Sequence, residues 1–113
     1  MITQIRPAQL SAWLASASVA GRPVVLDVRE PAELRIASIT GGDFTLVAIP
    51  MGSIAARLSE LEPNRPVACL CHHGGRSMQV ASFLDSRGFC NVANISGGIH
   101  AWAEELDQSI PRY

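Results

Sequence analysis

The sequence predicts an α/β fold with a mostly parallel sheet. Short apolar runs such as residues 24–28 and 67–70 lack the polar alternation of a half-exposed strand, which is typical of strands buried on both faces. The segments between these runs carry apolar residues at helical spacing. Strands that alternate with helices at short intervals indicate a layered α/β domain.

The first half of the chain is expected to begin with a short strand at residues 3–5, and Pro7 suits the first turn of a helix. One apolar stripe at i, i+3, i+4 and i+7 marks that helix: Leu10, Trp13, Leu14 and Ala17. Residues 24–28 form the next strand. A turn at residues 29–34 leads into a short helix, with Pro31 near its start.

The middle of the chain is harder to interpret. Gly41 and Gly42 mark a loop within residues 36–43. Residues 46–50 are interpreted as another buried strand, because the run is apolar throughout. A helix is expected next, with an apolar face of Ile54, Leu58 and Leu61.

The last third repeats the pattern twice. Residues 67–70 form a strand, and a helix that starts near Ser77 is expected to end at Gly88 as its C-terminal cap. Residues 91–95 form the last strand. The final helix carries four apolar residues: Ile99, Trp102, Ala103 and Leu106.

Composition narrows the function classes. The chain has 113 residues, enough for one domain (1–113) with a real core, and 48% hydrophobic against 17% charged residues indicates a globular protein. A formal net charge of -1 favours neither nucleic acid nor an anionic membrane as a partner. No apolar run is long enough to span a bilayer and no signal peptide is visible, so a cytoplasmic location is expected.

Residue usage excludes further chemistries. All nine cationic residues are arginine, which excludes Schiff-base chemistry and a P-loop lysine. No G-x-S-x-G elbow supports a serine hydrolase. Three cysteines are an odd number, which speaks against a disulfide framework and fits a reducing compartment.

Residues 71–77 are the stretch around which the chain is organised. A strand that leads through a Gly-rich turn into a helix places backbone N–H groups at a helix N-terminus, where they bind anions. Cys71 opens this loop, and the helix dipole together with Arg76 favours its thiolate. Segments after three other strands, at Asp27, Pro50 and Ser96, fall at the same carboxyl edge of the sheet, where ligands of such folds bind.

The loop has the pattern Cys-x4-Arg. A loop this short can curl around one sulfur atom with successive N–H groups pointing inward, and two glycines, Gly74 and Gly75, permit the required backbone angles. A persulfide on Cys71 is an anion that suits such a loop. The predicted mechanism is ping-pong: Cys71 attacks an activated sulfur donor, holds the outer sulfur and passes it to a nucleophilic acceptor.

Four motifs in order resemble the single-domain rhodaneses, a family of sulfurtransferases, over nearly the full chain. They are residues 26–33 (Leu-Asp-Val-Arg-Glu-Pro-Ala-Glu), 49–51 (Ile-Pro-Met), 71–77 (Cys-His-His-Gly-Gly-Arg-Ser) and 94–102 (Asn-Ile-Ser-Gly-Gly-Ile-His-Ala-Trp). Each alone is of limited specificity, whereas four with the right spacing are highly specific. The departure lies at residues 37–43, where the family usually carries Gly-His-Ile and then Pro-Gly-Ala.

The resemblance implies a rhodanese-like three-layer fold, with a central five-stranded, mostly parallel sheet flanked by helices. It implies that Cys71 is the nucleophile and that the residues after it hold the persulfide: His72, His73, Gly74, Gly75, Arg76 and Ser77. Arg76 would also attract an anionic donor such as thiosulfate. Cyanide or a thiol would be the acceptor, with a sulfur-accepting protein as an alternative, and no cofactor is expected.

Several residues have a simpler structural interpretation. Asp27 and Arg29 are expected to support the loop, although an Asp at a strand end often caps a turn. No metal is expected at His72 and His73, because adjacent positions point in different directions and the spacing matches no zinc site. Cys69 and Cys90 are expected in the core, with a resolving-cysteine role as the alternative.

Two rival functions remain open. A cysteine phosphatase or arsenate reductase could use a similar scaffold, but wrapping a tetrahedral oxyanion needs the longer pattern Cys-x5-Arg. A persulfide carrier or interaction module in a sulfur relay is the second alternative. The presence of Cys71 argues against an inactive module, whereas a carrier would use the same persulfide.

Overall fold

The computed structural model describes residues 2–17 and 21–113, and within them five strands form one parallel sheet. The strands are β1 (Thr3–Ile5), β2 (Val24–Asp27), β3 (Thr45–Ala48), β4 (Val67–Leu70) and β5 (Val92–Ile95). Their order is β1-β5-β4-β2-β3, and every neighbouring pair is parallel. The predicted α/β fold with five strands is therefore confirmed.

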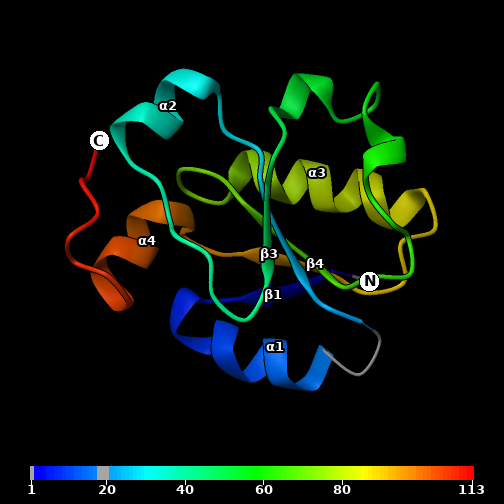
Figure 1. The fold of residues 1–113 in the computed structure, drawn as a ribbon, viewed down its shortest axis with the longest axis horizontal. Helices are drawn as coiled ribbons and strands as arrows, with labels where there is room; N and C mark the ends of the chain where they lie inside the picture. The colour runs from blue at the N-terminus through cyan, green and yellow to red at the C-terminus, as the bar shows by residue number, and fades with distance from the viewer. Residues whose placement is uncertain (1, 18–20) are drawn as a thin grey trace.

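Helices cover both faces of the sheet (Figure 1). The α-helices are α1 (Leu10–Ala17), α2 (Pro31–Ile36), α3 (Gly75–Ser86) and α4 (Gly98–Glu105), and η1 (Pro7–Gln9) leads into α1. One apolar core lies against α1 and α4, and the second lies against α3. No helix of the described residues is long and apolar enough to cross a membrane.

The strand register aligns three strand ends at one edge. Asp27 of β2 pairs with Leu70 of β4, and Cys69 of β4 pairs with Asn94 of β5. The residues that follow β2, β4 and β5 therefore leave the sheet at the same carboxyl edge, as predicted for the site.

The predicted cap of the helix after the cysteine loop is confirmed. Gly88 has φ +89°, and its N–H and that of Phe89 donate to the carbonyls of Asp85 and Leu84. A left-handed glycine just past a helix with these two bonds is a common helix terminus, because it satisfies carbonyls that would otherwise lack partners.

Three expectations for elements are wrong. β3 is not buried on both faces but is an edge strand, in which Leu46 is 37% exposed. No α-helix follows it: residues 51–61 form two short 3-10 segments, η3 (Met51–Ser53) and η4 (Leu58–Glu60), while Ile54 and Leu61 are buried as expected. Leu106 lies beyond α4 and is 49% exposed, because the helix ends one residue earlier.

The segment that departs from the family pattern, together with Phe44 directly after it, contributes to the core. Ala37, Ile39 and Phe44 are buried, and the Phe44 ring packs edge-on against Trp102 with centroids 6.5 Å apart. The Arg22 guanidinium donates to the Phe44 carbonyl at 2.9 Å. The unusual segment is thus fixed by apolar burial and by an arginine bound to its backbone.

Candidate active site

Cys71 follows β4 directly and lies at the start of the loop that leads into α3. Its side chain is 1% exposed. The Gly74 N–H donates to Sγ at 3.0 Å, and the Ser77 hydroxyl oxygen lies 3.3 Å from Sγ. The loop therefore curls around the sulfur as its short length predicts.

The surroundings of Cys71 stabilise its thiolate. Burial by itself raises the pKa of the thiol, because a charged sulfur loses hydration. The Ser77 hydroxyl and the backbone N–H groups of Ser77, Gly74 and His73 act in the opposite direction, and their net effect lowers the pKa below its usual value. Donors from the loop thus outweigh desolvation.

Two glycines permit the loop to pack closely on the turn before α4. Gly74, the residue before α3, has φ +106°. A Cβ on Gly98, which has φ +59°, would lie 2.4 Å from the carbonyl oxygens of both Cys71 and His72. The Ile99 N–H also donates to the Cys71 carbonyl at 2.9 Å. The N-terminus of α4 therefore holds the loop through its backbone.

The Ser77 hydroxyl has two acceptors for a single proton. Its oxygen lies 2.6 Å from Asn94 Oδ1 as well as 3.3 Å from Cys71 Sγ. The Asn94 amide nitrogen donates to Gln4 Oε1 and to the Gly74 carbonyl, so the amide oxygen must face Ser77. Asn94 thereby ties β5 to the sulfur site through Ser77.

Arg76 is bound by a carboxylate instead of facing an open anion site. Its two terminal nitrogens lie 2.7 Å from the two oxygens of Glu33, in a bidentate pair between α3 and α2. Sequence reasoning expected Arg76 to bind the donor. The structure gives this arginine a protein partner, while 34% of its side chain remains exposed.

Glu33 accepts hydrogen bonds from several directions. Besides Arg76, the Tyr113 hydroxyl and the Glu30 N–H donate to its carboxylate at 2.9 Å each. The bonds from Arg76 are the largest cause that lowers the pKa of Glu33 to about 2, against the opposing effect of burial. The carboxylate therefore stays charged and holds Arg76 in place.

Asp27 and Arg29 form a buried ion pair behind this network. The Arg29 Nε and Nη2 atoms donate to the Asp27 carboxylate at 3.0 and 2.8 Å, and the Arg29 side chain is fully buried. Arg29 Nη1 also donates to the Tyr113 hydroxyl at 3.0 Å. Within the described part of the chain, the side chains of this pair make no hydrogen bond to residues 71–77, and Arg29 connects to Glu33 through the Tyr113 hydroxyl.

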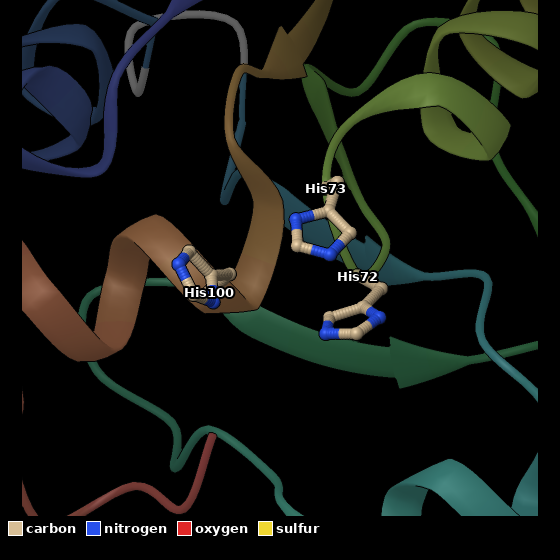
Figure 2. A group of neighbouring side chains, drawn as sticks. All are labelled: His72, His73 and His100. Carbon is tan, nitrogen blue, oxygen red and sulfur yellow. The ribbon is translucent and has the colours of Figure 1, made fainter. Parts of the chain in front are cut away.

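The loop histidines do not diverge, contrary to the sequence-based argument. The rings of His72 and His73 are stacked with centroids 3.9 Å apart, and His100 of α4 lies beside them (Figure 2). The Tyr113 ring stacks on the other face of His72 at 3.9 Å. Burial and the neighbouring His73 lower the pKa of His72.

The other two cysteines differ sharply. Cys69 is fully buried as expected, and burial raises the pKa of its thiol to about 12, so it stays protonated. Cys90 was expected in the core, but the structure exposes it. The turn after α3 buries Phe89 instead, which leaves the next residue facing solvent.

Sequence reasoning missed three residues of this site: Glu33, Asn94 and His100. All three lie inside motifs that were recognised, and an acidic partner for the loop arginine was a signal that could have been sought. His100 is one of only three histidines in the chain. Its place near the loop follows from the parallel edge, where α4 starts beside α3.

Comparisons with known proteins agree with this geometry. The family model for the rhodanese-like domain matches residues 7–105. The chain is 46% identical over 91 residues to the Rhodanese-like/PpiC domain-containing protein 12 of Arabidopsis thaliana, covering 79% of this chain and 30% of that protein. It is 34% identical to a sulfurtransferase of Allochromatium vinosum, in a match that covers 91% of this chain and 90% of that protein. It is 30% identical to the thiosulfate sulfurtransferase GlpE of Pseudoalteromonas translucida, in a match that covers 79% of this chain and 81% of that protein.

Solved structures show the same architecture. A rhodanese-related protein from Thermoplasma volcanium superposes with a TM-score of 0.74 at 33% identity, covering 92% of this chain and 93% of that one. A rhodanese-like domain protein from Staphylococcus aureus gives a TM-score of 0.76 at 25% identity, covering 99% of each chain. The chain therefore belongs to the rhodanese-like family of sulfurtransferases.

Proposed function

We propose that the chain transfers a sulfane sulfur from thiosulfate or a similar donor, through a persulfide on Cys71. The observation that carries the proposal is the convergence of loop donors on Sγ, with the Gly74 N–H at 3.0 Å and Ser77 Oγ at 3.3 Å. Donors that lower the pKa of the thiol also suit the terminal sulfur of a persulfide, because both species are sulfur anions.

The proposed reaction has two displacements. The Cys71 thiolate attacks the outer sulfur of thiosulfate, the sulfur–sulfur bond of the donor breaks, and sulfite leaves with the electron pair. A nucleophilic acceptor then attacks the outer sulfur of the persulfide, and the Cys71 thiolate leaves. With cyanide as acceptor the product is thiocyanate, and with a thiol it is a new persulfide.

The choice of donor rests on chemistry and on one relative. The relative named thiosulfate sulfurtransferase is 30% identical, which supports thiosulfate as the donor to test first. In the structure, Arg76 already pairs with Glu33, so we infer that Arg76 orders the loop and that the N–H groups meet the charge of the donor.

Other parts of the assignment stay predictions. A protein acceptor would make the chain a carrier in a sulfur relay, and this alternative uses the same persulfide. The cytoplasmic location is also a prediction, and the Arabidopsis relative is named as chloroplastic. We also propose that residues 1–113 form one domain and that its sulfur-transfer reaction needs no cofactor.

Intact mass spectrometry after thiosulfate treatment tests the persulfide. The wild-type chain should gain one sulfur, about 32 Da, and Cys71→Ser should gain none. Cys90→Ser is the matched control, because Cys90 is exposed and must be excluded as the labelled residue. An unmodified wild type, or a gain that survives Cys71→Ser, would overturn the proposal.

The phosphatase alternative needs its own assay. Here the loop is one residue shorter than a tetrahedral oxyanion requires, so hydrolysis of an aryl phosphate should be negligible beside sulfur transfer. Turnover of the phosphate ester at a comparable rate, lost in Cys71→Ser, would favour the phosphatase assignment instead.

A further inference from the structure

All three histidines of the chain meet at one place. His72 and His73 come from the cysteine loop, and His100 comes from the first turns of α4. Each offers one ring nitrogen, and the three nitrogens lie within 4.8 Å of one another. Figure 2 shows the three rings around a common space. This arrangement does not belong to the sulfur-transfer chemistry proposed above, in which no step uses an imidazole.

Two of the ring nitrogens are buried and unpaired. His72 Nε2 and His100 Nδ1 have no hydrogen-bond partner among the described residues. Leaving a buried polar atom without a partner is unfavourable, and such atoms in folded proteins are rare. Two of them on neighbouring rings of one cluster therefore indicate a ligand that supplies the missing interactions.

The other nitrogen of the His100 ring is held by the protein. His100 Nε2 lies 3.2 Å from Glu104 Oε1, one turn further along α4. Metal-binding histidines usually have one nitrogen on the metal and the other bound to a carboxylate or a backbone carbonyl.

The cluster is also preorganised. The His72 ring is stacked between His73 and Tyr113, at 3.9 Å from each. The backbone N–H of His100 donates to the backbone carbonyl of His72 at 3.2 Å, which fixes α4 against the loop. The His72 ring is thus fixed by stacking on both faces, and the start of α4 is fixed by a backbone bond, while His73 is exposed to solvent.

We propose that His72, His73 and His100 form a binding site for a divalent late transition metal such as Zn²⁺, next to the cysteine loop. Imidazole nitrogens suit zinc, copper and nickel, whereas calcium and magnesium prefer oxygen ligands. Three histidines around tetrahedral zinc, at about 2.0–2.1 Å each, leave the fourth position open. That geometry brings the nitrogens roughly 3.4 Å apart. The side chains must therefore move closer together on binding, from separations of up to 4.8 Å in the structure.

Zinc titration followed by NMR of the imidazole resonances is the direct test. Because the chain has only three histidines, every imidazole signal reports on this cluster. The measurement uses the full chain with Cys71→Ser and Cys90→Ser, so that thiolates cannot bind the metal. We expect all three imidazoles to shift with one equivalent of Zn²⁺, and His100→Ala to weaken binding by at least about tenfold.

Glu104→Gln provides a second variant that leaves all three ligands in place. Its side chain is 51% exposed, so the fold should be unaffected, and removing the charge beside His100 should weaken Zn²⁺ binding by about tenfold. Glu62→Gln, which changes an exposed glutamate that is 63% exposed and bound to Arg65, is the matched control and should bind Zn²⁺ as the parent does.

Three results would overturn the proposal. The first is the absence of imidazole shifts at equimolar Zn²⁺. The second is binding that is unchanged in both His100→Ala and Glu104→Gln. The third combines two measurements: Zn²⁺ does not bind, and His100→Ala raises the KM for thiosulfate in the chain that keeps Cys71. In that case the unpaired nitrogens would bind an anionic sulfur donor and not a metal.

Discussion

Replacing Ser77 with alanine tests whether a side chain, rather than the backbone alone, stabilises the Cys71 thiolate. The Ser77 hydroxyl is one of several donors that lower the pKa of the thiol against the effect of burial. Ser77→Ala keeps the backbone N–H groups of the loop and removes only the hydroxyl. We therefore expect the pKa of Cys71 to rise.

The size of the rise follows from the hydrogen-bond geometry. A bond to a charged acceptor contributes about 1.5–3 kcal/mol, which corresponds to roughly one to two pKa units. The contact with Sγ is 3.3 Å long, and Asn94 Oδ1 at 2.6 Å competes for the same proton. The lower end of that energy range therefore applies, and the pKa of Cys71 should rise by about one unit. At a pH below the Cys71 pKa of both wild type and variant, the thiolate fraction should fall about tenfold.

The rate of Cys71 alkylation by iodoacetamide, followed by mass spectrometry as a function of pH, measures this pKa. The assay is done with Cys90→Ser, since Cys90 is exposed, while Cys69 is buried and protonated and should not react. Ser86→Ala is the matched control on the same helix, because that hydroxyl donates to the Phe83 carbonyl within the helix and not to Cys71. An unchanged alkylation profile in Ser77→Ala would show that the Ser77 hydroxyl donates its proton to Asn94 Oδ1 and that the backbone alone stabilises the thiolate.

Two further predictions concern the frame of the site. The pKa of Glu33 is lowered to about 2, so the stability from its bonds is complete above pH 4.5 and is lost as the pH falls toward 2. Glu33→Gln should lower the free energy of unfolding in urea by about 2–3 kcal/mol at pH 6, and the difference from wild type should shrink below pH 4.5; an equal difference at every pH would contradict the assignment. Gly98→Ala should cost about 2–4 kcal/mol of stability, because its Cβ would lie 2.4 Å from two backbone oxygens of the loop. Gly41→Ala, with open space around the added Cβ, is the control, and equal unfolding midpoints for the two variants would refute this close contact.

The sequence predicts the sheet well because its three central strands, β2, β4 and β5, are buried along their whole length. Every strand of the structure overlaps a predicted one, and the register places the cysteine loop at the predicted edge. The secondary structure of residues 51–61 is harder to predict. The apolar spacing at Ile54, Leu58 and Leu61 is compatible with an α-helix as well as with consecutive 3-10 turns. Periodicity reports which side chains face the core, and it does so here for Ile54 and Leu61, but it does not set the hydrogen-bond pattern.

The partners of the site residues were less accessible from sequence. That Cys71 lies in a loop of N–H groups follows from local spacing, since the strand, the glycines and the helix are consecutive. The pairing of Arg76 with Glu33 joins residues 43 positions apart, and the approach of His100 to His72 depends on how α4 starts beside the loop. Both are tertiary contacts that no local pattern encodes.

The arginines near the cysteine loop are paired with carboxylates, which bears on how the loop would favour a sulfur anion. Arg76 is neutralised by Glu33, and Arg29 is neutralised by Asp27. These four groups sum to no net charge, so they provide little long-range attraction for a dianionic donor. The anion preference must then come from short-range dipoles, namely the N–H groups at the start of α3 that surround Cys71. Such donors act on whichever sulfur lies within hydrogen-bond distance, so in the proposed reaction they would stabilise the persulfide after the charged part of the donor has left.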